Sequence, residues 1–218
     1  MRITKYIHSC LLIEEGETKI LVDPGTYSFE HGGLKPEDFT GLAAIFITHS
    51  HPDHADPKAL KEIVANNPGL KVYGNSETQK VLHNEGVRVE VFEMSKKQIG
   101  TIAVDALPAS HEKLLVPEPV NTAYAFNKHV LVTGDSYDSR LSWFKQIPVL
   151  ATPIFAPWTD QLKTVAFIKS IAPKTFLPLH DGYVKDFFHE HMTAVFAHYL
   201  TDFGIEVRSL KSGEALET

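Results

Sequence analysis

Several features that would fix a class of protein are scarce or missing in this chain. Its 218 residues include one cysteine, Cys10, so no disulfide can form within the chain, and Cys10 is expected to be a small core residue. No apolar run approaches the ~18 residues of a membrane helix, and the start of the chain lacks the apolar core of a signal peptide. We therefore expect a cytoplasmic protein with no membrane partner.

Concentrated positive charge is also missing. The formal net charge is −6, and Lys96-Lys97 is the nearest approach to a basic block. Proteins that hold nucleic acids by their phosphates usually carry a basic surface. We therefore expect a small-molecule substrate and no nucleic acid as partner, although a basic groove can hide in an acidic chain. A homo-oligomer is compatible with this composition and is kept as an expectation.

Other absences bear on domain organisation and chemistry. The chain has no Gly-x-Ser-x-Gly elbow, the turn that carries a nucleophilic serine in one large class of hydrolases. It has no long linker and no low-complexity segment. With 43% hydrophobic and 22% charged residues, the composition is that of an ordinary globular protein. We predict a single domain over residues 1–218.

Apolar runs predict short strands, and capping residues with apolar periodicity predict helices. Strands are expected over residues 2–7, 10–14, 18–22, 42–47, 71–74, 87–93, 98–107, 121–126, 128–133, 149–156, 175–179 and 205–210. Helices are expected over residues 57–65, 76–84 with Ser76 as the cap, 137–146, 161–171 and 184–200. The last helix carries a long apolar stripe, which we assign to the core together with His191.

Three histidines and an aspartate stand out at the end of one predicted strand. The apolar run over residues 42–47 is followed at once by His49, His51, Asp53 and His54. His49 and His51 share a face in extended chain, whereas Asp53 and His54 are neighbours that point in different directions and suit a second metal. Imidazole and carboxylate are the ligands of divalent cations such as zinc. The alternative is a polar loop whose histidines are hydrogen-bonded within the protein.

More residues of the same types follow other strand-like runs. His111, Asp135 and His180 each come after such a run, the second of them at a Thr-Gly-Asp turn. Taken alone, they could be a surface histidine, a helix cap and a turn histidine. Asp23 ends a further strand and could hold a metal-bound imidazole in place, or could simply sit in a Pro-Gly turn. His8 is either bonded to backbone or close to the same site.

The stretch from His49 to His54 resembles the His-x-His-x-Asp-His signature of the metallo-β-lactamase superfamily. This resemblance implies an α/β fold, a four-layer αββα sandwich in which two mixed β-sheets are flanked by helices, with metal bound at one edge. It also implies two metal sites. The first would be formed by His49, His51 and His111, and the second by Asp53, His54 and His180. Asp135 would be the carboxylate that bridges them. Asp23 matches an aspartate that ends the corresponding strand in the family.

Two details narrow the resemblance. Many members of the superfamily carry a Gly- and Thr-rich turn around the histidine that matches His111, and this chain does not, so it looks nearest to the ascorbate-6-phosphate lactonase-like branch. In the oxygen-reducing di-iron branch the second histidine of the signature is typically glutamate. Here it is His51, which favours hydrolysis. Zinc is the first candidate for the two divalent ions, and manganese or iron are alternatives.

The expected reaction is the hydrolysis of a small ester, lactone or phosphoester by a hydroxide held between two metal ions. Asp53 is the expected catalytic residue, because a spare carboxylate oxygen can orient the nucleophile or pass its proton. Trp158 and Tyr183 are candidates for the substrate wall. Two alternatives stay open, an RNA or DNA phosphodiesterase of the same fold and a metal-stabilised binding protein without turnover.

Overall fold

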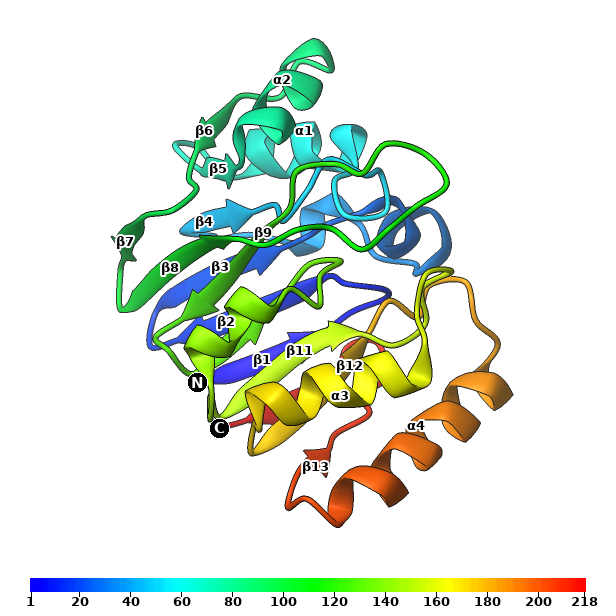
Figure 1. The fold of residues 1–218 in the computed structure, drawn as a ribbon. Helices are drawn as coiled ribbons and strands as arrows, with labels where there is room; N and C mark the ends of the chain where they lie inside the picture. Colours follow the sequence, from blue (N-terminus) through cyan, green and yellow to red (C-terminus); the bar gives the residue numbers. More distant parts are fainter.

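Two seven-stranded mixed sheets lie face to face in the computed structural model, which describes residues 1–218 (Figure 1). The first sheet has the order β14 (Ala215–Glu217), β1 (Arg2–Lys5), β2 (Leu11–Glu15), β3 (Thr18–Val22), β4 (Ala44–Phe46), β5 (Lys71–Gly74) and β6 (Val89–Val91). The second has the order β13 (Glu206–Val207), β12 (Thr175–Leu179), β11 (Val149–Pro153), β10 (Val130–Val132), β9 (Thr122–Phe126), β8 (Ile102–Pro108) and β7 (Lys96–Ile99).

Helices cover the outer side of each sheet. The first sheet is covered by α1 (Pro57–Asn66) and α2 (Ser76–Asn84), and the second by α3 (Gln161–Ile171) and α4 (Asp186–Thr201) (Figure 1). Separate apolar clusters fill the space beneath each helix pair. The expected four-layer αββα sandwich is therefore confirmed.

The central core lies between the two sheets. Phe46 on β4 is fully buried there, and its ring centroid lies 5.0 Å from that of Tyr73, 5.1 Å from that of Tyr124 and 5.8 Å from that of Phe126. Two of these neighbours belong to the opposite sheet. Because both faces of each sheet are covered, the central strands are apolar on both sides, which is why they appear in the sequence as continuous apolar runs.

Parallel strand pairs bring the predicted site to one edge of the sandwich. In the first sheet β3 pairs in parallel with β4, and in the second β10, β11 and β12 form a parallel set. Parallel neighbours end at the same edge, so the turns that follow them lie together. The sheets are also joined there, because the Tyr124 hydroxyl donates to the Ile47 carbonyl at 3.0 Å and the Thr122 amide to the Thr48 carbonyl at 2.9 Å.

The helix expected over residues 137–146 is instead a short 3-10 helix, Ser139–Phe144. Its buried apolar residues, Leu141 and Phe144, are three positions apart. This spacing aligns side chains along a 3-10 helix, and it offers too few apolar residues to hold a longer α-helix against the sheet. Residues 27–40, where the sequence analysis placed neither a helix nor a strand, contain a π-helical turn and a 3-10 turn.

The strand expected over residues 98–107 is divided between the two strands of a hairpin. Gly100 has a φ of +53°, a left-handed conformation that suits glycine, and it turns the chain between β7 and β8. The cap of α2 lies one residue before the expected Ser76, because the Asn75 side chain accepts a hydrogen bond from the Thr78 amide.

Helix α4 buries a narrower face than expected. Met192 and Phe196 are buried against the second sheet, whereas Val195 and Tyr199 remain 40% and 47% exposed. A helix that packs on the outside of a sheet buries only the side that faces the sheet. The apolar stripe of α4 is wider than that buried side. The assignment of the whole stripe to the core is wrong, and so is that of His191, which is exposed. No helix in the structure is both long and apolar enough to cross a bilayer.

The position of Phe46 between the sheets predicts a large loss of stability on truncation. The substitution Phe46→Ala should lower the free energy of unfolding by about 3–5 kcal/mol, because it removes a buried aromatic side chain and leaves a cavity. Urea unfolding followed by circular dichroism measures the change. The matched substitution Trp143→Ala removes a side chain that is 84% exposed and should cost less than ~0.5 kcal/mol. Equal costs for the two would contradict the described core.

Candidate metal centre

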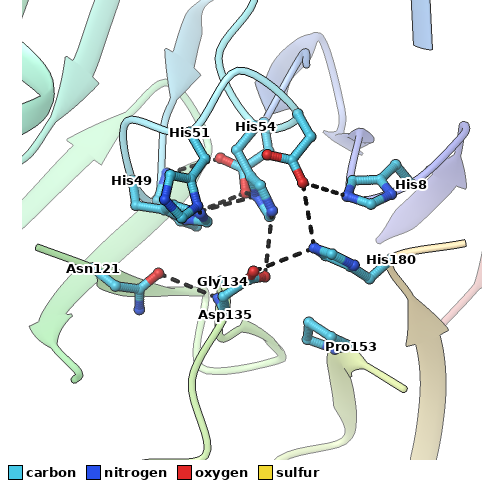
Figure 2. Close-up of polar contacts among 12 residues, drawn as sticks. His8, His49, His51, His54, Asn121, Gly134, Asp135, Pro153 and His180 are labelled. Atoms are coloured by element: carbon cyan, nitrogen blue, oxygen red, sulfur yellow. Dashed lines mark hydrogen bonds and ion pairs between the residues drawn. The ribbon is translucent and has the colours of Figure 1, made fainter. Parts of the chain in front are cut away.

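The turns that carry the predicted ligands converge at one edge of the sandwich. The loop after β4 carries the histidine-rich motif from the first sheet, and the turns after β8, β10 and β12 approach it from the second (Figures 1 and 2). Their side chains form two clusters. In each cluster the candidate ligand atoms lie within 4.8 Å of one another, and the members are His49, His51, His111 and Asp135 in the first and His8, Asp53, His54 and His180 in the second.

This grouping brings together every residue that the sequence analysis assigned to the metals, and it adds His8. That these residues bind metal stays a prediction.

Asp135 lies between the two clusters. One carboxylate oxygen, Oδ1, is 3.3 Å from Nε2 of His54. The other, Oδ2, is 3.2 Å from Nε2 of His180 and 3.5 Å from Nε2 of His111. The carboxylate therefore faces imidazoles of both clusters, and Oδ2 alone lies near one ring of each, a position that suits a bridging ligand.

The imidazole rings are oriented by partners on their Nδ1 side. His54 Nδ1 lies 2.8 Å from a carboxylate oxygen of Asp23, and His111 Nδ1 lies 2.7 Å from the Glu112 carbonyl. Both partners can only accept, so each Nδ1 carries a proton and donates it, and each Nε2 is the nitrogen that faces the centre. Asp23 thus contacts a candidate metal-binding imidazole, as the sequence analysis expected.

The rings of His49 and His180 follow the same rule through hydroxyl groups. The Thr48 hydroxyl donates to Asp23 at 2.7 Å, so it accepts from His49 Nδ1 at 3.0 Å. The Tyr183 hydroxyl donates to a backbone carbonyl, so it accepts from His180 Nδ1 at 2.9 Å. In each ring Nε2 is again the nitrogen that is free to bind a cation.

Several of the atoms that face the centre lie 3.2 to 3.5 Å from a neighbouring carboxylate or imidazole without forming a hydrogen bond of good geometry. These buried atoms are Nε2 of His54, of His111 and of His180, together with Oδ1 of Asp135. A buried polar atom without a hydrogen bond costs about 1–3 kcal/mol, so such a group of them is unfavourable in the protein alone. Imidazole nitrogens and carboxylate oxygens fit divalent cations such as zinc, manganese or iron, and such cations would satisfy these atoms.

The charges of the centre are tightly coupled. Burial would raise the pKa of Asp135, but the imidazoles of His180 and His54 hold it well below its usual range. Burial would lower the pKa of His54, but the carboxylates of Asp135 and Asp23 raise it well above its ordinary value. For His49, burial and the neighbouring His54 both lower the pKa and keep the ring neutral. A proton on His54 therefore balances the buried carboxylates where a cation would otherwise do so.

Asn121 is part of this scaffold and was missed in the sequence analysis. Its amide group donates to the carbonyls of Ala109 and Thr133 at 3.2 and 3.0 Å, and its oxygen accepts from the Asp135 amide at 3.3 Å (Figure 2). It thereby ties the turn that precedes His111 to the turn that carries Asp135. No motif marks an asparagine at the start of a strand, so nothing in the sequence pointed to this role.

The candidate substrate residues lie beside the centre. The ring centroid of Trp158 lies 6.2 Å from that of His111 and 6.3 Å from that of His180, so the indole packs beside one histidine of each cluster. Tyr183 is 42% exposed, but its hydroxyl is already used to orient His180. Their contact with a substrate stays a prediction.

His8 lies at the back of the second cluster, fully buried. Its Nε2 is 3.0 Å from Oδ2 of Asp53, and its ring lies beside that of His180, with the centroids 3.8 Å apart (Figure 2). Burial and the nearby His180 lower the pKa of His8 to about 4, so the ring is neutral. Of the two interpretations that the sequence left open, the structure thus supports a place at the site.

The chain matches the family described as "Beta-lactamase superfamily domain" over residues 2–180. It belongs to that superfamily. Protein Rv0786c of Mycobacterium tuberculosis is 35% identical over 186 residues, which make up 84% of this chain and 85% of that protein. A "UPF0173 metal-dependent hydrolase" of Aeropyrum pernix is 29% identical in an alignment of 202 positions that covers 83% of this chain and 82% of that protein.

Two other proteins are also similar to this chain. A crystal structure from Parabacteroides distasonis, described provisionally as a metal-dependent hydrolase, superposes with a TM-score of 0.76 at 24% identity and covers 95% of this chain and 91% of its own. Exodeoxyribonuclease WalJ of Streptococcus pneumoniae is 29% identical over 141 residues, 58% of this chain and 50% of that enzyme. The chain is thus a metal-dependent hydrolase of the metallo-β-lactamase superfamily. Its placement near the lactonase-like branch stays a prediction.

Zinc binding to the metal-free hydrolase should release protons, and the affinity for zinc should rise with pH. The reason is the raised pKa of His54, which keeps a proton on the ring that must leave before Nε2 can bind zinc. Calorimetric titrations in two buffers of different ionisation enthalpy count the protons released. An affinity that does not change between about pH 6 and 8, where histidines ordinarily titrate, would contradict this account of the centre.

Proposed function

We propose that this hydrolase cleaves a small-molecule ester, lactone or phosphoester with two divalent cations, zinc first and manganese or iron as alternatives. The observation that carries the proposal is the position of Asp135, which lies 3.2 to 3.5 Å from imidazole nitrogens of both clusters. A structural zinc site needs about four ligands that close around one ion. This edge offers donors for two ions and a carboxylate to join them.

The residues divide between the two cations as the clusters do. The first cation would be held by His49, His51 and His111, the second by Asp53, His54 and His180, and both by Asp135. When bound, such a pair would lower the pKa of water from about 15.7 toward ~7 and polarise an oxygen of the substrate, which is the chemistry that hydrolysis at neutral pH requires.

Asp53 is the carboxylate that a substrate can reach. Its side chain is 24% exposed, whereas that of Asp135 is 3% exposed. Burial would raise the pKa of Asp53, but the hydrogen bond from His8 and the imidazoles of His54 and His180 lower it, so the carboxylate is ionised. We assign to Asp53 the orientation of the attacking water and the acceptance of its proton.

Aromatic side chains shape the approach to the centre. Trp158 lies beside candidate ligands of both clusters, and Tyr183 and Tyr27 form a neighbouring pair with ring centroids 5.8 Å apart. Flat apolar walls of this kind suit a small organic substrate.

A nucleic-acid phosphodiesterase is the second candidate, and the similarity to exodeoxyribonuclease WalJ supports it. Against it stand the net charge of −6 and the absence of any basic block in the sequence, because contacts to phosphates need lysine and arginine. The match to WalJ also covers only half of that enzyme. We therefore rank the small-molecule reaction first.

The reaction class can be tested with the purified protein. We expect turnover of chromogenic phosphodiesters or of esters and lactones in a substrate panel, supported by zinc or manganese and abolished when a chelator removes the metal. Turnover of oligonucleotides alone would instead support the phosphodiesterase. Unfolding on chelation, without turnover under any condition, would indicate a metal-stabilised binding protein and contradict the proposal.

The substitution Asp135→Asn should weaken loading of the two-metal centre and reduce kcat/KM by more than about 100-fold. Substitution of a residue that only hydrogen-bonds to a metal ligand already lowers metal affinity or activity about 10–100-fold, and substitution of a bridging carboxylate should lower them more. Metal content per chain is measured by elemental analysis after gel filtration. His191→Phe, at an exposed position on α4, is the control and should keep metal content and rate. An Asp135→Asn variant that is fully loaded and as fast as the parent would exclude the bridging role.

A further inference from the structure

His8 differs from the other histidines of the centre in what faces its Nδ1. The rings of His54 and His111 meet hydrogen-bond acceptors at this atom. His8 Nδ1 meets a donor, because the backbone amide of Gly182 lies 3.0 Å away. An amide can only donate, so Nδ1 of His8 must be the unprotonated nitrogen, and a neutral ring then carries its proton on Nε2.

We infer that His8 is a positioning residue for Asp53, to which its Nε2–H donates a hydrogen bond, and that it is not a ligand of the second cation. The contact is short, with Nε2 3.0 Å from Oδ2 of Asp53. The inference rests on the proposed function, in which Asp53 belongs to the second cation site. It separates His8 from the other members of its cluster, although all of them lie close enough to share one ion.

The alternative, in which His8 binds the cation through Nε2, requires the proton to move to Nδ1. That would place two hydrogen-bond donors, Nδ1–H of His8 and N–H of Gly182, face to face at 3.0 Å. It would also remove the hydrogen bond to Asp53. Each of these changes is unfavourable in a buried position, where an unpaired donor costs about 1–3 kcal/mol.

The ring cannot avoid this conflict by turning, because its backbone is hydrogen-bonded and two aromatic rings pack against it. The His8 amide donates to Oδ1 of Asp181 at 2.8 Å, and the His8 carbonyl accepts from the His180 amide at 3.0 Å. One face of the ring lies against His180, and Tyr27 lies 4.8 Å away, centroid to centroid. A Cβ added to Gly182 would come within 2.9 Å of Nδ1, which shows how closely the chain approaches the ring.

A buried ion pair fixes the segment that holds His8. Asp181 accepts from Nζ of Lys5 at 2.6 Å, and the Lys5 side chain is almost completely buried. A buried pair of this kind is costly to break from one side. The first strand and the turn after β12 are thereby locked together, and the donor that faces Asp53 is held in one orientation before any cation arrives. Such outer-shell donors set the orientation of a ligating carboxylate.

Two substitutions separate the positioning role from a ligand role. His8→Asn places at φ +68° a residue that tolerates the left-handed region, but its side chain is too short to reach Asp53. His8→Gln is longer and can restore a donor near the position of Nε2. His180→Gln serves as the reference for loss of a ligand, and His83→Gln, at an exposed residue of α2, serves as the matched control.

Zinc alone is the first probe. Under saturating zinc we expect two ions per chain in His8→Asn, as in the parent and in His83→Gln, but with an affinity for the weaker-bound ion lowered about 10–100-fold. His8→Gln should recover part of that loss, and His180→Gln should bind one ion. A single ion per chain in His8→Asn, or an affinity equal to that of the parent, would each overturn the inference.

The second probe is the protonation of the ring itself. Nitrogen-15 spectra of the histidine side chains, with the His8 signals assigned by their loss in His8→Asn, should show Nε2 protonated and Nδ1 unprotonated both without and with zinc. Loss of the Nε2 proton on zinc loading would identify His8 as a ligand. Neither probe needs a substrate. If the proposed reaction fails but zinc binding and the nitrogen-15 spectra are as expected, this inference still holds. If the reaction occurs but those two results are not as expected, only this inference is wrong.

Discussion

The buried carboxylate of Asp135 is the group on which the arrangement of the centre depends. A charge with 3% of its side chain exposed is stable only if opposite charge surrounds it, and imidazoles from both sheets provide that surrounding. In the metal-free protein a proton on His54 balances part of the charge. Cations would do so more completely, and they would also satisfy the imidazole nitrogens that lack a hydrogen bond of good geometry. Folding and cation binding therefore favour the same closed edge.

Which nitrogen of each imidazole faces the centre is decided by the group that hydrogen-bonds to the other nitrogen of the ring. Asp23, the Glu112 carbonyl and the Tyr183 hydroxyl each accept a hydrogen bond from an Nδ1–H and so turn Nε2 toward the centre. The Gly182 amide does the reverse to His8. Imidazole can play either part, and the backbone or side-chain group behind each ring selects which. The centre is thus specified by outer contacts as much as by the residues that form it.

Much of this could be predicted from sequence, for a physical reason. Buried strands appear as apolar runs, and a polar residue that ends such a run marks an edge of a sheet, which is how His111, Asp135 and His180 were found. Contacts between turns that lie far apart in the sequence leave no such periodic signal, so Asn121 was missed and His8 stayed ambiguous. The apolar stripe of α4 was misjudged because periodicity reports which side of a helix is apolar, but not how much of that side the sheet covers.

The backbone shows where function was favoured over local stability. His8, Asp23 and His180 have φ values of 68°, 46° and 76°, in the left-handed region that normally favours glycine. Each such residue costs of order 1–2 kcal/mol, and a glycine would avoid the cost. A glycine could not supply the imidazoles or the carboxylate that these positions bring to the centre. The strain is tolerated because hydrogen bonds hold both the backbone and the side chain of each residue. The left-handed conformation turns the chain sharply after three strands, so that these side chains can meet.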